Sequence, residues 1–183
     1  PDLESLLKAF SEEANTWFAE RTNVDENYAF IQDFFEPEHL QSAEWEDFRE
    51  LGNHIRGLNP LVRSAAFQQQ NHPVEQYRSS FGYLARGEDP LPNRVDRFLK
   101  DEDLSIDYVG ESTLSVLPGM LFADECQIYS DRKLAAAQVV GIEPNIEVGD
   151  SLGEILKAFT DATEPVVENY EEIVGSRTEM PSG

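Results

Sequence analysis

The chain has 183 residues, 40% of them hydrophobic, and its 11 Phe, 6 Tyr and 2 Trp supply enough apolar material for one folded domain, which excludes a disordered chain. It carries 36 acidic and 14 basic residues, a net charge of −22, and one cysteine, so an internal disulfide and a multi-cysteine zinc site are excluded. No apolar run approaches the ~20 residues that span a bilayer, and no secretory signal pattern is present. We therefore expect a cytoplasmic protein without a membrane partner.

The excess of acid indicates a salty solvent. Carboxylates on one protein repel each other, and about 1 M salt shortens the screening length to about 3 Å. Only four of the 14 cations are lysines. We interpret this composition as that of a protein from a halophilic prokaryote; an ordinary acidic interaction domain is the alternative.

The charge is distributed unevenly along the sequence. Residues 1–55 carry 14 acids and 3 bases, net −11, and residues 101–183 carry 18 acids and 4 bases, net −14. Residues 56–100 carry 7 bases and 4 acids, net +3. Two explanations fit this reversal equally well: contact with a phosphate backbone, or ion pairing with the acidic flanks.

Apolar residues recur at spacings of three and four, the pattern of amphipathic helices. The predicted helices cover residues 2–20, 25–35, 41–55, 61–70, 73–86, 93–100, 131–140 and 151 onward. In the first helix the apolar face consists of Leu3, Leu6, Leu7, Phe10, Ala14, Trp17 and Phe18. Because no segment alternates with the period of a strand, the predicted fold class is all-α: one multi-helix domain of about seven to eight helices over residues 1–175, with a frayed tail at 176–183.

Short polar residues and glycine predict where helices begin and end. The predicted N-caps are Ser42, Asn93, Ser130 and Ser151, and the predicted C-terminal glycine of the 131–140 helix is Gly141. Pro165 lacks the N–H that a helix interior needs, so it kinks the last helix or opens a new one. The residues that we expect to be buried after it are Val166, Val167 and Tyr170.

The segment LPGML, residues 117–121, resembles the start of the hairpin in helix-hairpin-helix DNA glycosylases. That hairpin continues with a second glycine so that backbone N–H groups reach a phosphate, but this protein has Leu121 there. The family also needs a catalytic Asp further downstream, and Asp131 lies only 12 residues after Gly119. A turn between two buried segments is the alternative, and the one that we favour.

A longer resemblance covers residues 74–142, from "VEQYRSSFGYLARGEDPLPNRVDRFL" to "YVGESTLSVLPGMLFADECQIYSDRKLAAAQVVGI". This stretch is similar to a helical segment in the N-terminal regions of McrB-like AAA+ restriction proteins and related prokaryotic defence proteins. The matching residues are Gly110, Leu114, Ser115, Asp124, Ile128, Tyr129, Arg132 and Gly141, while Ser130 replaces the usual Asn. The resemblance implies a non-catalytic nucleic-acid recognition module. It also implies a separate AAA+ ATPase motor, because the sequence has no GxxxxGK[ST] loop.

The candidate nucleic-acid-binding residues are the arginines Arg78, Arg86, Arg94, Arg97 and Arg132. Arg94 and Arg97 stand three residues apart on one predicted helix face, where they clamp phosphate or pair with acidic neighbours. The amides of residues 67–73 (FQQQNHP) either read base edges or simply end a helix.

No other group predicts chemistry. His39, His54 and His72 lack the spacing of metal ligands, so we predict no metal site, no cofactor and no catalytic residue. Asp124 and Glu125 beside Cys126 raise the pKa of a thiol.

Three functions therefore stay open. The first is a non-catalytic DNA-recognition domain that belongs to, or partners, a restriction ATPase. The second is a protein-interaction scaffold whose basic middle pairs with its acidic flanks. The third is a helix-hairpin-helix glycosylase with Asp131 as its catalyst. Phosphate contacts lose about 0.9 log units of affinity per contact per decade of salt concentration. In a salty cytoplasm the first function must therefore depend more on base stacking and on the shape of the nucleic acid than on counterion release.

Overall fold

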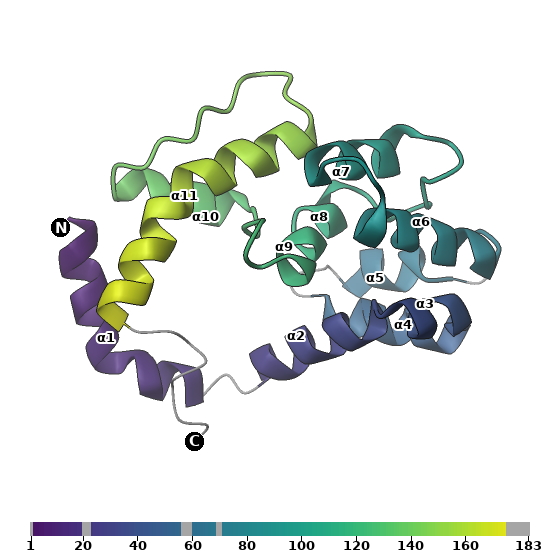
Figure 1. The fold of residues 1–183 in the computed structure, drawn as a ribbon, viewed down its shortest axis with the longest axis horizontal. Helices are drawn as coiled ribbons and strands as arrows, with labels where there is room; N and C mark the ends of the chain where they lie inside the picture. The colour runs from purple at the N-terminus through teal and green to yellow at the C-terminus, as the bar shows by residue number, and fades with distance from the viewer. Residues whose placement is uncertain (1, 20–22, 56–59, 69–70, 175–183) are drawn as a thin grey trace.

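The computed structural model describes residues 2–19, 23–55, 60–68 and 71–174, and within these ranges the fold is all-helical, as predicted. Figure 1 shows the arrangement. The helices are α1 (Leu3–Ala19), α2 (Asn23–Phe34), α3 (Pro37–Ser42), α4 (Trp45–His54), α5 (Pro60–Ala66), α6 (Val74–Arg86), α7 (Leu91–Lys100), α8 (Glu111–Leu114), α9 (Leu117–Leu121), α10 (Asp131–Val139) and α11 (Leu152–Val174).

The predicted number of seven to eight helices is too low because three short helices carry no readable periodicity. α3, α8 and α9 have six, four and five residues, which is at most two turns each. A hydrophobic period of 3.6 needs several turns before it stands out from chance. The eight longer helices all correspond to segments that the periodicity predicts.

Two of the predicted N-caps are wrong. Ser42 ends α3 instead of starting α4, and α4 begins after Glu44, whose backbone N–H donates to Asp47 Oδ2 over 2.7 Å. Asn93 lies inside α7, which begins after Pro90. Pro92 lies in the first turn of α7, where a proline supplies a helical φ without needing an N–H partner.

The other predicted ends of α10 and α11 are confirmed. Ser130 Oγ accepts from the Lys133 N–H over 3.3 Å, and Gly141 follows α10 with φ +82°. Ser151 caps α11 and exchanges hydrogen bonds with Glu154, whose side chain accepts from the Ser151 N–H over 2.7 Å. The capping serines and the C-terminal glycine therefore lie at the helix ends that the sequence predicts.

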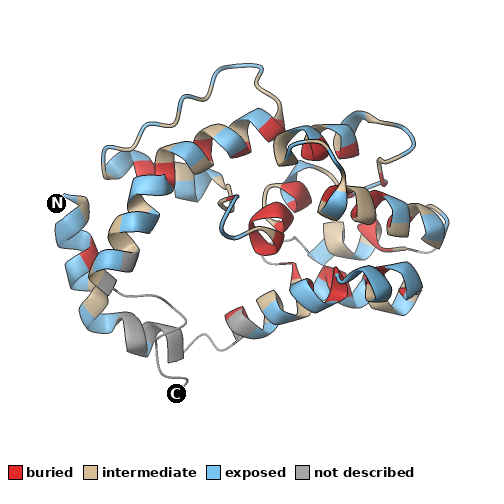
Figure 2. Cartoon of the chain, in the orientation of Figure 1, coloured by how far each residue is buried: buried red, intermediate tan, exposed pale blue. Residues whose placement is uncertain are grey.

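A continuous aromatic core holds the middle helices together. Its fully buried rings include Phe34 of α2, Phe48 of α4, Tyr77 and Phe81 of α6, and Phe98 of α7. The Phe48 and Phe81 ring centroids lie 5.9 Å apart, and those of Phe81 and Phe98 lie 5.5 Å apart. Figure 2 shows that the buried residues concentrate in these helices and in α9, while α1 and α10 are mostly exposed. The core thus fixes α2, α4, α6 and α7 relative to each other.

The LPGML segment forms the short helix α9 inside this core, not a turn or a hairpin. All five of its residues are buried. A Cβ added to Gly119 would lie 2.6 Å from the backbone nitrogen of Ile128, so the glycine allows the 126–129 segment to cross closely over α9. Its role here is packing, and no exposed hairpin presents this glycine to a phosphate.

The last helix continues through Pro165 and joins two parts of the molecule. Its N-terminal part packs on α7, and its other main partner is α1, so the first and last helices lie side by side (Figure 1). The expectation that Val166, Val167 and Tyr170 are buried is wrong. Val167 is 38% exposed and the other two are half-buried, because α1 covers only part of this helix.

Candidate functional site

Arg94, the first of the predicted nucleic-acid-binding arginines, is a buried structural residue. It is 8% exposed, donates from Nη1 to the Leu84 carbonyl over 2.5 Å, and lies 5.1 Å from the centroid of the Phe122 ring. Burial lowers the pKa of its guanidinium, and its buried Nε has no hydrogen-bond partner among the described atoms. A phosphate outside the protein cannot reach this side chain without unpacking the core.

Arg78 and Arg86 on α6 are held by backbone carbonyl groups of neighbouring segments. Arg78 Nε donates to the Ala43 carbonyl over 2.9 Å, and its Nη2 lies 2.8 Å from Glu44 Oε1. Arg86 donates to the carbonyl of Phe35 at the end of α2. Both arginines therefore tie α6 to the first third of the sequence.

Arg97 and Arg132 are exposed, but they do not complete a face with the others. Arg97 bridges Asp89, at 3.0 Å, and Asp101, at 3.2 Å, and it stacks over Tyr83 with its guanidinium carbon 5.0 Å from the ring centroid. Arg132 lies on the first turn of α10 and forms no hydrogen bond or ion pair with any described residue.

Among the described cations of residues 56–100, Arg78 and Arg97 pair with acids of the flanks, whereas Arg86 and Arg94 donate to backbone carbonyl groups. Arg78 pairs with an acid of the N-terminal flank, and Arg97 pairs with Asp101 at the start of the C-terminal flank. The five predicted arginines differ in exposure, since Arg94 is buried while Arg97 and Arg132 are exposed.

The histidines and the cysteine also have internal roles. His54 stacks on Phe30 with ring centroids 3.9 Å apart, and Nε2 of His72 accepts from the Asp107 N–H over 3.1 Å. Burial, more than the charge of Glu125, raises the pKa of Cys126 to about 11. Among the described residues, no three His, Cys, Asp or Glu side chains gather in a way that could hold a metal ion.

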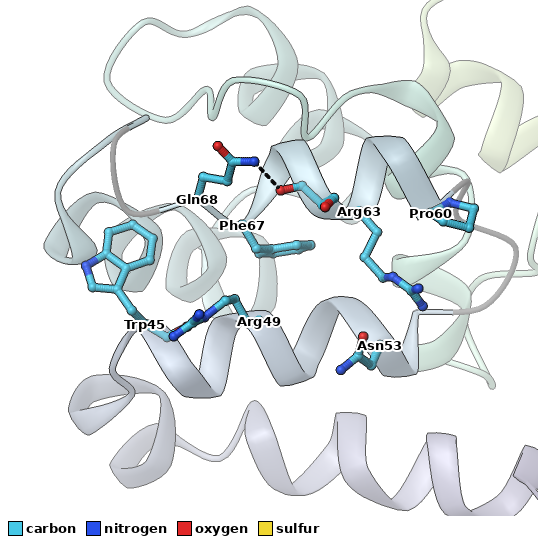
Figure 3. Close-up of a pocket in the computed structure, with 8 residues that line it drawn as sticks. Trp45, Arg49, Asn53, Pro60, Arg63, Phe67 and Gln68 are labelled. Carbon is cyan, nitrogen blue, oxygen red and sulfur yellow. Dashed lines mark hydrogen bonds between the residues drawn. The ribbon is translucent and has the colours of Figure 1, made fainter.

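A groove between α4 and α5 brings together apolar, polar and basic side chains (Figure 3). It has a volume of about 710 Å³, within the range of ligand sites in proteins. α4 contributes Trp45, Arg49 and Asn53, and α5 and the residues after it contribute Pro60, Arg63, Ser64, Phe67 and Gln68.

The close packing of the two helices shapes the floor of this groove. A Cβ at Gly52 would lie 2.7 Å from the Phe67 ring, so glycine lets that ring settle onto α4. Phe67 is 2% exposed, and its far side meets the core at Tyr77, 6.3 Å away between ring centroids. Trp45 closes one end, half-buried, with its ring 4.9 Å from that of Tyr77. The floor is therefore apolar and fixed.

The polar groups of α4 at the rim have partners within their own helix. Arg49 Nη2 lies 2.6 Å from Glu46 Oε1, and Asn53 Nδ2 donates to Glu50 Oε2 over 3.0 Å. Arg49 is 61% exposed, so this pair contributes little to stability.

Arg63 stands apart from the five arginines of the predicted binding face. It is half-buried in the groove, yet it forms no hydrogen bond or ion pair with any residue that the structure describes. Figure 3 shows its side chain reaching from α5 toward α4, between Phe67 and Pro60. A guanidinium has five N–H donors in a fork that matches a carboxylate or a phosphate. The site can therefore accept one anionic group above an apolar floor.

The sequence analysis missed this groove, although a signal for it exists. Trp45, Arg49 and Asn53 recur every four residues along one helix face. The residues that face them from α5, at positions 60, 63, 64, 67 and 68, also follow the spacing of one helix face. Neither of these two spacings shows, from the sequence alone, that the faces of α4 and α5 pack against each other. Of the amide segment that the sequence singled out, Gln68 lines the groove, Asn71 bonds the Ala65 carbonyl, and residues 69–70 lie outside the described ranges.

The comparisons with known proteins add no relative. No protein-family model, no curated protein and no solved structure matches the sequence. Within the described ranges, no helix has the length and apolar character needed to cross a membrane. The similarity of residues 74–142 to McrB-like proteins stays a prediction.

Proposed function

We propose that this protein is a non-catalytic interaction module that binds a partner protein through the groove between α4 and α5. The observation that carries this proposal is Arg63, a half-buried guanidinium without a partner among the described residues, in a protein of net charge −22. Arg78, Arg86, Arg94 and Arg97 all have acceptors within the fold. An arginine left unpaired in such acidic surroundings is suited to an acceptor from outside.

The ligand group that fits best is a single carboxylate next to an apolar side chain. The carboxylate accepts from Arg63, and the apolar side chain covers the floor at Phe67 and Trp45. A polyanion is a poorer match, because Glu46 and Glu50 stand on the same helix as the rim and repel each added charge. An aspartate, a glutamate or the terminal carboxylate of a partner supplies the required group.

Selection from a display library of random twelve-residue peptides tests this proposal. We expect selected peptides to share a carboxylate beside an apolar residue. Their Kd should rise roughly ten- to hundredfold in Arg63→Gln, since a hydrogen bond to a charged group is worth about 1.5–3 kcal/mol. Arg132→Gln is the matched control, because it removes an exposed arginine on α10. Peptides that bind Arg63→Gln as tightly as the wild type would contradict the proposal.

Single-stranded nucleic acid is the second candidate, and Trp45 is the observation that favours it. A half-buried indole beside Arg49, Arg63 and the Asn53 amide has the composition of a stacking platform for a base. In this second candidate function the nucleic acid binds in the α4/α5 groove. It does not bind at the face predicted from the sequence, which consists of Arg78, Arg86, Arg94, Arg97 and Arg132. The similarity to McrB-like proteins makes an AAA+ restriction ATPase the expected partner in either case.

Fluorescence anisotropy with labelled single- and double-stranded DNA across a KCl series separates the two candidates. The nucleic-acid function requires single-strand binding that weakens with salt and is lost in Trp45→Leu and Arg63→Gln. No binding at any KCl concentration at which circular dichroism shows a folded protein removes it and leaves the protein partner.

The acidity itself fits a protein that works in concentrated salt, and we propose a halophilic prokaryotic cytoplasm as its setting. In that solvent the repulsion among surface carboxylates is screened within a few ångströms. A carboxylate ligand in a partly enclosed groove keeps more of its attraction to Arg63 than an exposed phosphate would keep.

A further inference from the structure

A second surface lies where α1, α10 and α11 meet, at the opposite end of the molecule from the α4/α5 groove (Figure 1). It contains an apolar groove of about 320 Å³. The side chains that form most of it are Leu3, Ala136, Val140, Phe159, Val166 and Val167. We call this the arm groove.

Two of the three helices around the arm groove, α1 and α10, bury few of their described side chains. Among the described side chains, α1 buries Leu7 alone and α10 buries Ala137 alone. Three apolar residues on these helices are exposed: Leu6 at 38%, Val139 at 77% and Val167 at 38%. Of these three, Val167 lines the arm groove, together with the half-buried Leu3, Val140 and Val166. Apolar residues that gather around a groove in this way mark an interaction site.

The charge beside the arm groove identifies the kind of partner. Glu164 and Glu168 flank Val167 on α11, both are exposed, and neither forms an ion pair with a residue that the structure describes. One cation, Lys133, lines the groove, and it already takes part in an interaction within the molecule. A second copy of this protein would bring the same acidic surface, which matches Glu164 and Glu168 less well than a basic partner does.

We infer that the arm groove binds an amphipathic helix of a partner protein that carries Lys or Arg beside its apolar face. The apolar face lies against Val140, Phe159 and Val166, in the manner of other helix-in-groove interactions. The basic side chains pair with Glu164 and Glu168 at the rim. This site is independent of the α4/α5 groove.

Two matched peptides test the inference. Each is a fourteen-residue helix with the same leucine and alanine face, flanked by lysines in one and by glutamates in the other. We expect the full-length protein to bind the lysine peptide at least tenfold more tightly in isothermal titration calorimetry, at the lowest KCl concentration at which it is folded. Glu164→Gln/Glu168→Gln should reduce that preference, and added KCl should reduce it further.

Two substitutions locate the site. Val167→Gln places a polar group in the arm groove and should raise the Kd of the lysine peptide at least fivefold. Val148→Gln changes a fully exposed residue of the 140–151 loop and should leave its Kd unchanged. Both positions are exposed, so circular dichroism should show the wild-type fold.

Three results would overturn the inference. The first is equal binding of the two peptides, and the second is binding that Val167→Gln leaves intact. The third is a concentration-dependent dimer in light scattering that Val167→Gln abolishes, since this would assign the arm groove to a second copy of the protein.

Discussion

Five arginines of this protein show how position decides what one side-chain type does. Arg94 is buried and donates from Nη1 to the Leu84 carbonyl, and Arg78 and Arg86 donate to carbonyl groups of other segments. Arg63, half-buried in a groove, has no acceptor among the described residues, and Arg97 is divided between two aspartates. Substituting Arg94 would therefore test stability, and only Arg63 offers a test of binding.

Gly119 gives a residue-scale prediction about α9. In Gly119→Ala the new Cβ would lie 2.6 Å from backbone and 2.7 Å from the Ile128 side chain, so α9 or the crossing segment must shift. We expect a loss of about 1–3 kcal/mol in the free energy of unfolding, the usual cost of overpacking. Urea unfolding followed by circular dichroism measures it.

Gly82 is the control, because a Cβ there meets only Leu40, at 3.9 Å, inside the same kind of helix. Gly82→Ala should stabilise the protein by about 0.5–1 kcal/mol. A Gly119→Ala variant as stable as the wild type would argue for an exposed hairpin at LPGML.

Cys126 gives a prediction about pH. Burial raises the pKa of its thiol from 9.0 to about 11, so at pH 8 the thiolate fraction is roughly a hundredfold below that of the unfolded state. Reaction with a disulfide reagent should be slower by at least that factor in the folded protein. The unfolded thiol loses its proton first, so stability is complete below pH 9 and falls as the pH rises from 9 toward 11. A fast reaction at pH 8 would show that the thiol is accessible.

At the scale of the helix, the N-terminus of α11 depends on its cap. Ser151 Oγ accepts from the Glu154 N–H. The Glu154 carboxylate accepts from the N–H and the hydroxyl of Ser151, and these two hydrogen bonds lower the pKa of Glu154. Ser151→Ala should cost about 1 kcal/mol in thermal or urea unfolding. Ser79→Ala, at an exposed position inside α6, should be neutral or slightly stabilising. Equal effects of the two substitutions would mean that the cap does not hold α11.

Most helices could be predicted from the sequence because the signals that define them are local. The periodicity of Phe34, Phe48, Leu51 and Phe81 and the caps at Ser130 and Ser151 need no knowledge of the rest of the fold. The failures arise where the decision belongs to tertiary structure. α9 is a helix because the core surrounds it, and Val167 stays exposed because α1 ends up covering another part of α11.

At the scale of the whole molecule, the net charge of −22 predicts how stability responds to salt. We expect the midpoint of thermal unfolding to rise by at least ~5 °C between 0.1 and 1 M KCl, which corresponds to about 2 kcal/mol for a protein of this size. The control is a variant in which six exposed glutamates become glutamines: Glu102, Glu111, Glu143, Glu147, Glu164 and Glu168. Its unfolding midpoint should depend less on KCl, and an unchanged dependence would show that screening is not the cause.

The binding groove could not be predicted because it belongs to two helices at once. Arg49 and Arg63 stand on separate stripes, and only the packing of Phe67 onto Gly52 brings those stripes together. In the sequence, the dense basic segment at 78–97 stands out more clearly than Arg49 and Arg63 do, so it is the segment predicted to bind a ligand. That density reflects the many internal acceptors that those arginines satisfy.

The pairing of α1 with α11 also has a consequence for how the protein is made. Synthesis runs from the N-terminus, so α1 leaves the ribosome long before its main partner exists. At about 5–20 residues per second, the amphipathic face of α1 waits on the order of ten seconds or more for α11. During that time Leu3, Leu6 and Leu7 are open to chaperones and to neighbouring nascent polypeptides. The synthesis of α11 therefore ends the period in which α1 is most vulnerable.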